Sequence, residues 1–186
     1  MSCREDPYRT DALRFQEAYR RFLRDNPNSP VPIVLRPHYV WDSLFFPYNP
    51  LYRIVAEVSP LPMSRFYRFE YSDGTADSLR WWGFLLLPWQ GDTLRLHLFL
   101  TEAGDDSAFF LPFYDATNGQ TTYGGGRYLD IPYDTGRLIV DFNLATHPYC
   151  AYSDQYSCMA PPSANSLPFP VWAGERIIDP TKHKRQ

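Results

Sequence analysis

The sequence has no long hydrophobic run and carries few charged residues. Its longest apolar stretch, WWGFLLLPW at 81–89, contains a glycine and a proline and is far shorter than the roughly 20 residues of a membrane-spanning helix. Asp, Glu, Lys and Arg together make up only 21% of the chain, and the net charge is −3. We therefore expect no transmembrane segment and no nucleic-acid partner, because nucleic-acid binding requires a basic surface.

The sequence also lacks the signatures of the common nucleotide-binding and hydrolytic enzymes. It contains neither a G-x-x-x-x-G-K-[ST] phosphate loop nor a G-x-S-x-G nucleophile elbow. The triplet DTG at 134–136, which is found in aspartic proteases, occurs once and is equally good turn chemistry. The residues thus favour a protein without enzymatic activity over an enzyme.

Aromatic residues and prolines are abundant instead. Phe, Trp and Tyr account for 17% of the 186 residues, and 18 prolines are spread along the chain. This composition favours short strands and loops over a helical bundle. We predict an all-β fold, either an antiparallel sandwich or a partly open barrel, with one N-terminal helix and a long ordered C-terminal coil.

One segment near the N-terminus has helical periodicity. Residues 11–25 follow Thr10, a good N-cap, and are followed by the proline-rich run NPNSPVP, which cannot continue a helix. Residues at helical spacing form an apolar stripe that we expect to pack on the sheet: Phe15, Ala18, Tyr19 and Phe22.

The middle of the chain has the two-residue periodicity of strands. In 93–100, for example, four leucines alternate with Arg95, His97 and Phe99. From Thr146 onward the periodicity is lost, which predicts the ordered coil. The predicted strands are 51–58, 66–71, 80–87, 93–100, 108–113 and 137–142.

We divide the chain into three parts. Residues 1–10 are expected to be a flexible N-terminal segment, 11–180 a single β-rich domain and 181–186 a basic tail. No signal peptide is visible in the chain as it stands, which predicts a cytoplasmic protein. The alternative is an exported lipoprotein anchored through Cys3, in the N-terminal context MSCREDPY.

Three consecutive glycines provide the main candidate site. Their backbone N–H groups and the following arginine are suited to hold an anion, whereas a tight bend between strands is the structural alternative. Polar residues flank the glycines, and Arg127 is expected to pair with Asp130 or Asp141. The candidate ligand-binding residues are Tyr123, Gly124, Gly125, Gly126, Arg127, Asp130, Asp141 and Asn143.

Cys150 and Cys158 form a second candidate group. They suit a disulfide in an exported protein, and free thiols or metal ligands in a reducing cytosol. A tetrahedral metal site would need further ligands, such as His147 or His97. We expect no cofactor, with a metal ion as the weaker alternative.

Three stretches resemble the bacterial and archaeal family numbered 1684 among the domains of unknown function. They are FLPFYDATNGQTTYGGGRYLDI at 110–131, VDFNLATHPYCAYSDQYSC at 140–158 and LPFPVWAGE at 167–175. The resemblance implies no established activity. It does imply a lipoprotein-like layout, which favours the hypothesis that Cys3 carries a lipid anchor. It also argues against His147 as a metal ligand, because members commonly have an Asn-Pro pair at that position.

Three functional hypotheses follow. The first is a β-rich binding module with a small polar or anionic ligand near the bend at 124–127. The second is a structural or interaction domain of a lipoprotein. The third is a metal- or thiol-dependent enzyme that uses Cys150 and Cys158. The first requires the late coil to fold back so that both sulfurs lie near the glycines.

Overall fold

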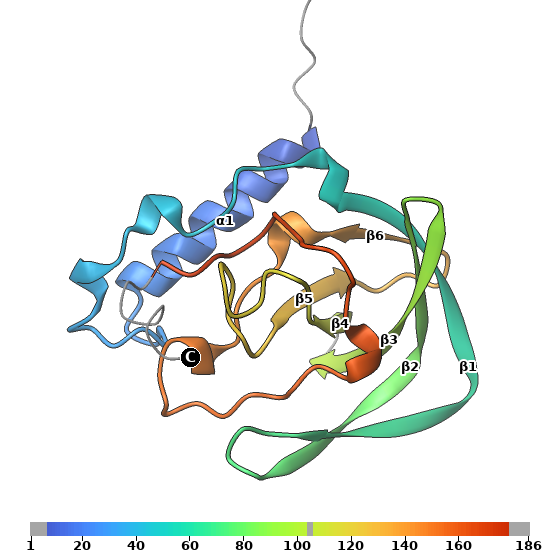
Figure 1. The fold of residues 1–186 in the computed structure, drawn as a ribbon. Helices are drawn as coiled ribbons and strands as arrows, with labels where there is room; N and C mark the ends of the chain where they lie inside the picture. Colours follow the sequence, from blue (N-terminus) through green and yellow to red (C-terminus); the bar gives the residue numbers. More distant parts are fainter. Residues whose placement is uncertain (1–6, 104–105, 179–186) are drawn as a thin grey trace, which may run out of the picture.

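A computed structural model describes residues 7–103 and 106–178 of the chain (Figure 1). Cys3 and the basic tail at 181–186 lie outside these residues. The described part contains one α-helix, six strands and several short 3-10 turns. The helix and strands are α1 (Pro7–Asp25), β1 (Arg53–Glu70), β2 (Ala76–Trp89), β3 (Asp92–Ala103), β4 (Asp106–Phe113), β5 (Arg127–Pro132) and β6 (Arg137–Asp141). The 3-10 turns are η1 (Arg36–His38), η2 (Trp41–Ser43), η3 (Pro50–Tyr52), η4 (Phe142–Leu144), η5 (Tyr149–Ala151) and η6 (Ser163–Asn165).

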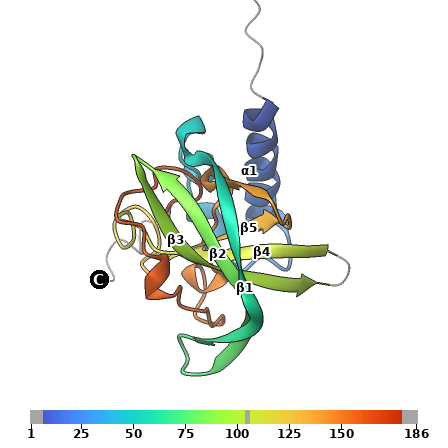
Figure 2. The ribbon, with the colours of Figure 1, turned by 90° about the vertical axis from the view of Figure 1, so that its right-hand side faces the viewer.

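The strands form one antiparallel sheet in the order β5-β4-β3-β2-β1-β6. The two outer strands, β5 and β6, come into contact, so the sheet curls into a nearly closed barrel (Figures 1 and 2). Helix α1 lies on the side opposite the long β1–β2 hairpin. The predicted all-β fold with one N-terminal helix is confirmed, in its barrel form.

Two of the predicted strands are a single strand. Residues 53–58 and 66–70 of these predictions both belong to β1, whereas residues 51–52 lie in η3 and Tyr71 follows the strand. Strand β1 pairs with β2 from Glu57 to Glu70. The pairing register shifts between Pro60 and Arg65, opposite Gly83. Prolines lack the N–H that a ladder needs, so they interrupt the pairing locally without ending the strand. The two-residue periodicity is lost in this irregular stretch, so the sequence predicted two strands separated by residues 59–65.

The helix begins earlier and is rotated relative to our expectation. It starts at Pro7, so residues 7–10, predicted to be flexible, form its first turn and Thr10 is not its cap. Proline suits the first helical position because the N–H it lacks would have no partner there. The buried positions are Ala12, Gln16 and Leu23. Of the predicted stripe, Tyr19 and Phe22 pack against a core cluster as expected, whereas Phe15 and Ala18 are exposed.

A polar contact explains the rotation. The Gln16 amide faces the barrel and donates a hydrogen bond of 2.9 Å to the Asn143 carbonyl. A buried glutamine is acceptable because its amide has a partner. Hydrophobic periodicity alone assigns such a residue to the solvent face, which displaces the predicted stripe by about one residue.

Apolar side chains fill the barrel and also cover part of its outside. Leu96, Leu98 and Leu100 of β3 point into the main core, as their alternation predicted. On the opposite face of β3, Phe99 is buried in a second cluster with Phe69 and Phe110. The core members from the other strands include Ile54, Ala56, Leu85, Leu87, Phe109, Leu111, Leu129, Ile131, Leu138 and Val140.

The predicted ordered coil is observed as far as the described residues extend. From Phe142 to Ile178 it runs across the barrel and is attached at several points by single β-bridges (Figure 1). These bridges join Met159 to Tyr71, Ser166 to Tyr114 and Glu175 to Phe45. Among the described residues there is no helix with both the length and the apolar character needed to cross a membrane.

Candidate ligand-binding cavity

The three glycines form a tight bend between the β4–β5 connection and β5. Gly126 has a φ of +90°, and a Cβ there would lie 2.8 Å from the Phe113 carbonyl oxygen and 2.7 Å from Pro161 Cγ. Both conditions require glycine. At Gly125, a Cβ would meet the Tyr123 ring at 2.4 Å. The bend interpretation is therefore correct, and Gly126 belongs to the packed interior.

Arg127 does not reach a ligand site, because its side chain is fully buried in the barrel. Its Nη2 donates to Asp115 Oδ2 at 2.8 Å, and both side chains are 0% exposed. Its guanidinium also donates to the carbonyls of Ala173, Val171 and Glu175. Burial lowers the pKa of Arg127, and the nearby Asp115 carboxylate opposes that effect. Arg127 thus anchors the C-terminal coil.

The expected partners of Arg127 were wrong, because Asp115 takes that role. Asp115 Oδ1 accepts hydrogen bonds from the Thr117 N–H at 2.8 Å and from the Val171 N–H at 3.1 Å. Asp130 lies on the exposed face of β5, since side chains alternate along a strand and Arg127 points inward. Asp130 is therefore separated from the buried ion pair.

Asp141 and Asn143 hold η4 against neighbouring segments. Asp141 Oδ1 accepts from the Asn143 N–H at 3.0 Å and from Asn143 Nδ2 at 2.8 Å. The Asn143 amide also exchanges two hydrogen bonds with the backbone of Asn49, at 2.9 and 3.0 Å. Asn143 is 0% exposed, so these contacts are those of a structural clamp.

Cys150 and Cys158 form a disulfide. Of the three possibilities left open by the sequence, the structure contains this one. The Cys158 segment is also bound to the tip of the β1–β2 hairpin, where the Ser72 N–H donates to the Cys158 carbonyl at 3.2 Å. In the described residues no group of three or more His, Cys, Asp or Glu side chains is arranged to hold a metal.

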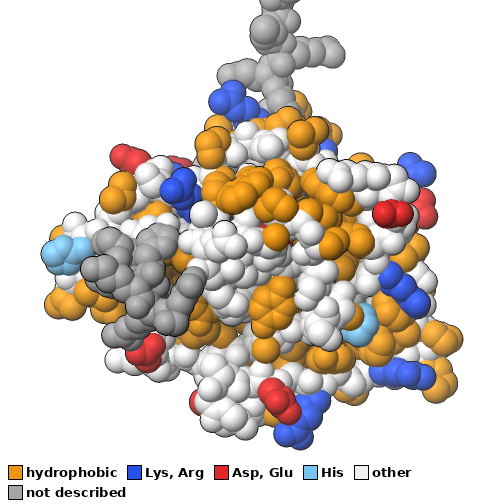
Figure 3. All heavy atoms as spheres, in the orientation of Figure 1, with side chains coloured by type: hydrophobic (Ala, Val, Ile, Leu, Met, Phe, Trp, Pro, Cys, Tyr) orange, Lys and Arg blue, Asp and Glu red, His pale blue; other side chains and the backbone are white. Residues whose placement is uncertain are grey.

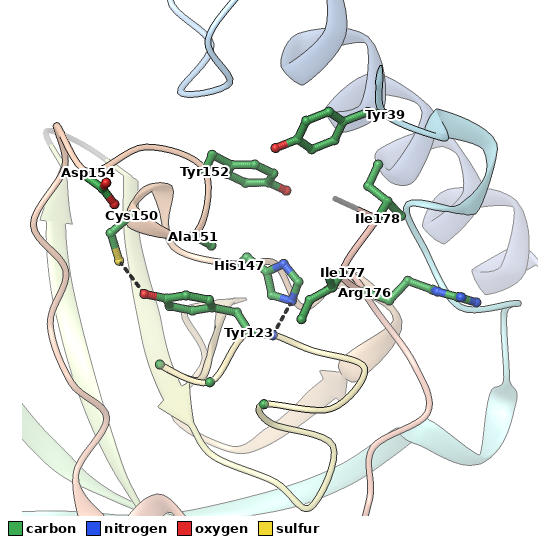
Figure 4. A pocket seen from close by; sticks show the side chains of 13 residues that line it. Tyr39, Tyr123, His147, Cys150, Ala151, Tyr152, Asp154, Arg176, Ile177 and Ile178 are labelled. Carbon is green, nitrogen blue, oxygen red and sulfur yellow. Dashed lines mark hydrogen bonds between the residues drawn. The ribbon is translucent and has the colours of Figure 1, made fainter. Parts of the chain in front are cut away.

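A cavity of about 380 Å³ lies where the glycine bend meets the disulfide segment (Figure 4). This volume falls within the range of small-molecule sites. The expectation that the coil brings the sulfurs to the glycines is met, because Gly124, Gly125 and Cys150 line the same cavity. The remaining lining residues are Tyr39, Gly119, Tyr123, His147, Ala151, Tyr152, Asp154, Arg176, Ile177 and Ile178.

Three tyrosines dominate the walls. The rings of Tyr39 and Tyr152 lie side by side with centroids 6.5 Å apart, and Tyr123 lies on the other side of the cavity in Figure 4. The Tyr123 hydroxyl is 3.6 Å from Cys150 Sγ. Tyr152 is only 6% exposed, and among the described residues its hydroxyl has no hydrogen-bond partner. A buried hydroxyl without a partner carries a desolvation cost.

His147 forms the floor and is held from both sides. Its Nε2 accepts a hydrogen bond from the Tyr123 N–H at 3.2 Å, and its Nδ1 lies 3.4 Å from Glu175 Oε1. Because Nε2 is an acceptor, the proton of the neutral ring is on Nδ1, facing Glu175. Glu175 Oε2 also accepts from the His147 N–H at 2.7 Å. This arrangement fixes the histidine and places a buried carboxylate behind it.

The two remaining charged residues of the lining are oriented differently. Asp154 is exposed at the rim, and the pKa of Tyr123 is raised, first by burial and then by the Asp154 carboxylate. The Arg176 side chain extends away from the tyrosines in Figure 4, with its guanidinium 5.4 Å from the centre of the Phe46 ring. The interior is thus lined by aromatic rings, with one carboxylate at the rim.

Sequence reasoning missed most of these walls. Tyr39 comes from a proline-rich loop about 80 residues before the glycines, and Tyr152 and Asp154 lie inside the Cys150–Cys158 loop. The tyrosine pair flanking Asp154 in AYSDQYS was the available signal. Of the predicted ligand-binding residues, the cavity includes Tyr123, Gly124 and Gly125, and it excludes Gly126, Arg127, Asp130, Asp141 and Asn143.

Comparison with known proteins agrees with the earlier resemblance. The model of the family described as "Protein of unknown function (DUF1684)" matches residues 42–176. The chain belongs to this family. The solution NMR structure of an uncharacterized protein from Haloarcula marismortui is 34% identical, with a TM-score of 0.72, covering 92% of this chain and 95% of that one. No curated protein matches the chain.

Proposed function

We propose that this DUF1684 protein is a binding module that holds a small polar ligand in the cavity between Gly124–Gly125 and the Cys150–Cys158 loop. The observation that carries the proposal is the aromatic-lined cavity itself, with Tyr152 as a wall residue whose buried hydroxyl has no described hydrogen-bond partner. Groups of this kind in a concave, aromatic-lined space are typical of ligand sites.

The construction of the walls supports this function. The floor residue His147 is fixed by Tyr123 and Glu175, and one wall is closed by a disulfide. Walls held by hydrogen bonds and a covalent bond need little reorganisation when a ligand enters. Such preorganisation lowers the entropic cost of binding.

Titration of ¹⁵N-labelled protein with a library of small polar compounds tests the proposal. We expect saturable amide shifts at Tyr123–Gly125 and Ala151–Asp154. A Gly124→Val variant adds a side chain at the lining, where an added Cβ lies 3.8 Å from its nearest neighbour, and should weaken binding. Gly136→Val, outside the cavity, should leave binding unchanged. If no compound shifts the cavity amides, the proposal is wrong.

The disulfide and the exposed apolar side chains favour a second candidate, an exported interaction domain. Disulfides persist in oxidising compartments. Ile33, Val34 and Val40 of one loop are 74%, 72% and 60% exposed, and apolar side chains occupy much of the face seen in Figure 3. For this candidate, fractionation of cells that express the protein from its native gene, with any upstream leader included, should show membrane attachment that is lost in the Cys3→Ser variant. Equal recovery in the soluble fraction would rule out the lipid anchor.

The thiol-enzyme alternative has less support. In the disulfide, neither sulfur is a thiolate, which is the form that attacks substrates or binds metals. His147 also uses Nε2 to accept from the backbone and directs Nδ1 toward Glu175. A sulfur or histidine free to react is therefore not available at this cavity in the oxidised protein.

A further inference from the structure

The cavity does not have the positive charge that the glycine bend suggested. Arg127, the residue expected to attract an anion, is neutralised by Asp115 inside the barrel and does not line the cavity. Arg176 lines it but directs its guanidinium toward Phe46. No other lysine or arginine of the described chain lines the space. An anionic ligand would therefore meet no inward-pointing cation there.

The remaining groups favour positive charge. Asp154 stands at the rim, and the buried Glu175 carboxylate lies behind His147. His147 directs no proton of its Nε2 into the cavity, because that nitrogen accepts a hydrogen bond from the Tyr123 N–H. The walls include the rings of three tyrosines, and aromatic rings attract cations to their faces through the negative potential of their π-systems.

We infer that the ligand of this cavity is a small organic cation, an alkylammonium or quaternary ammonium compound, enclosed by Tyr39, Tyr123 and Tyr152 with Asp154 at the entrance. This inference rests on the proposed binding function and specifies its ligand class. Tyr123 and Tyr152 lie on opposite sides of the cavity, so a cation between them contacts more than one ring (Figure 4). Tyr152 contributes its ring to the cavity wall, while its hydroxyl is buried.

The apolar part of the lining fits the same ligand class. Ile177, Ile178 and Ala151 contribute aliphatic surface next to the rings. The methyl groups of a quaternary ammonium spread its charge over an apolar surface, so it loses little hydration when it enters such a space. An inorganic anion would leave this surface without a matching group.

The test compares choline with 3,3-dimethylbutanol, its uncharged carbon isostere, by amide shifts in ¹⁵N-labelled full-length protein. We expect choline to bind at least about tenfold more tightly, because only its charge differs. Acetate and inorganic phosphate serve as anionic probes and should bind more weakly than choline. Asp154→Asn, a change at an exposed rim residue, should weaken choline binding about threefold, with less effect at high salt.

A pair of substitutions at one ring separates the π-face from the hydroxyl. Tyr123→Phe keeps the ring and should bind choline within about twofold of wild type, whereas Tyr123→Leu should bind about tenfold more weakly. The amide spectrum of each variant reports whether the fold is retained. If Tyr123→Leu does not fold, the comparison of choline with 3,3-dimethylbutanol and the Asp154→Asn variant still test whether the cavity prefers a cation.

The outcomes distinguish the two proposals. If 3,3-dimethylbutanol, acetate or phosphate shifts the cavity amides at lower concentration than choline, the cation assignment is wrong while the binding function stands. If none of these probes and no other compound shifts the cavity amides, both are wrong. Equal binding of choline by Tyr123→Leu and wild type would likewise overturn the aromatic enclosure.

Discussion

Tyr123 and Arg127 are four residues apart on the same glycine bend, yet they face opposite environments. Arg127 points into the barrel, is 0% exposed and has both a carboxylate and backbone carbonyls as partners. Tyr123 lies on the cavity side, with its hydroxyl near Cys150 and its N–H bonded to His147. In the interior, Arg127 has four protein partners, although its Nε has no described hydrogen-bond partner; on the cavity side, the single hydroxyl of Tyr152 has none.

The difference shows how to separate structural polar residues from candidate binding residues. Three buried polar residues use their side chains to bond other parts of the chain: Asp115, Arg127 and Asn143. Such residues fix the fold, because leaving any one of them without a partner is costly. Cavity residues such as Tyr152 keep polar atoms unused. The number of partners, and not polarity itself, distinguishes the two regions.

The largest expected effect comes from breaking the buried ion pair. Arg127→Met leaves the Asp115 carboxylate buried without its charge partner and should lower the free energy of unfolding by about 3–5 kcal/mol. Chemical denaturation measures the change. The matched control is Arg137→Met, whose ion pair with Glu57 spans 4.0 Å with an arginine side chain 76% exposed, and it should change stability by less than about 1 kcal/mol. Equal effects would mean that Arg127 is not the anchor described here.

A smaller effect should distinguish the two sides of the glycine bend. Gly126→Ala forces a side chain into a φ of +90° and against the Phe113 carbonyl, so it should destabilise the protein by about 1–3 kcal/mol. Gly124→Ala faces open space, with its nearest neighbour at 3.8 Å, and should leave stability unchanged or raise it by up to about 1 kcal/mol. Thermal melting of both variants is the measurement. A reversed order would contradict the division between interior and cavity.

The smallest expected difference concerns two tyrosine hydroxyls. Tyr52 donates to the Pro170 carbonyl at 3.1 Å, so Tyr52→Phe should cost about 1 kcal/mol of unfolding free energy. The Tyr152 hydroxyl has no partner in the described structure, so Tyr152→Phe should be neutral or slightly stabilising in the absence of ligand. Urea denaturation of the two variants side by side compares them. A loss at Tyr152 as large as that at Tyr52 would show that its hydroxyl is already bonded.

The fold was largely predictable because its signals are local. The alternation of leucines with Arg95 and Phe99 in β3 and the turn residues between strands are set by backbone geometry at short range. The helix rotation was not predictable, because it depends on a hydrogen bond between Gln16 and Asn143, which are 127 residues apart. The partner of Arg127 was missed for the same reason, since Asp115 lies on a separate turn before the bend.

The sequence by itself determined the strands, the glycine bend and the ordered late coil, because these follow from side-chain periodicity and from residues with special backbone freedom. Only the tertiary structure decided which polar side chains are hydrogen-bonded within the barrel and which line a cavity. The physical reason is that a hydrogen bond or ion pair depends on atoms within about 3 Å, and the closure of the barrel brings those atoms together from distant parts of the chain.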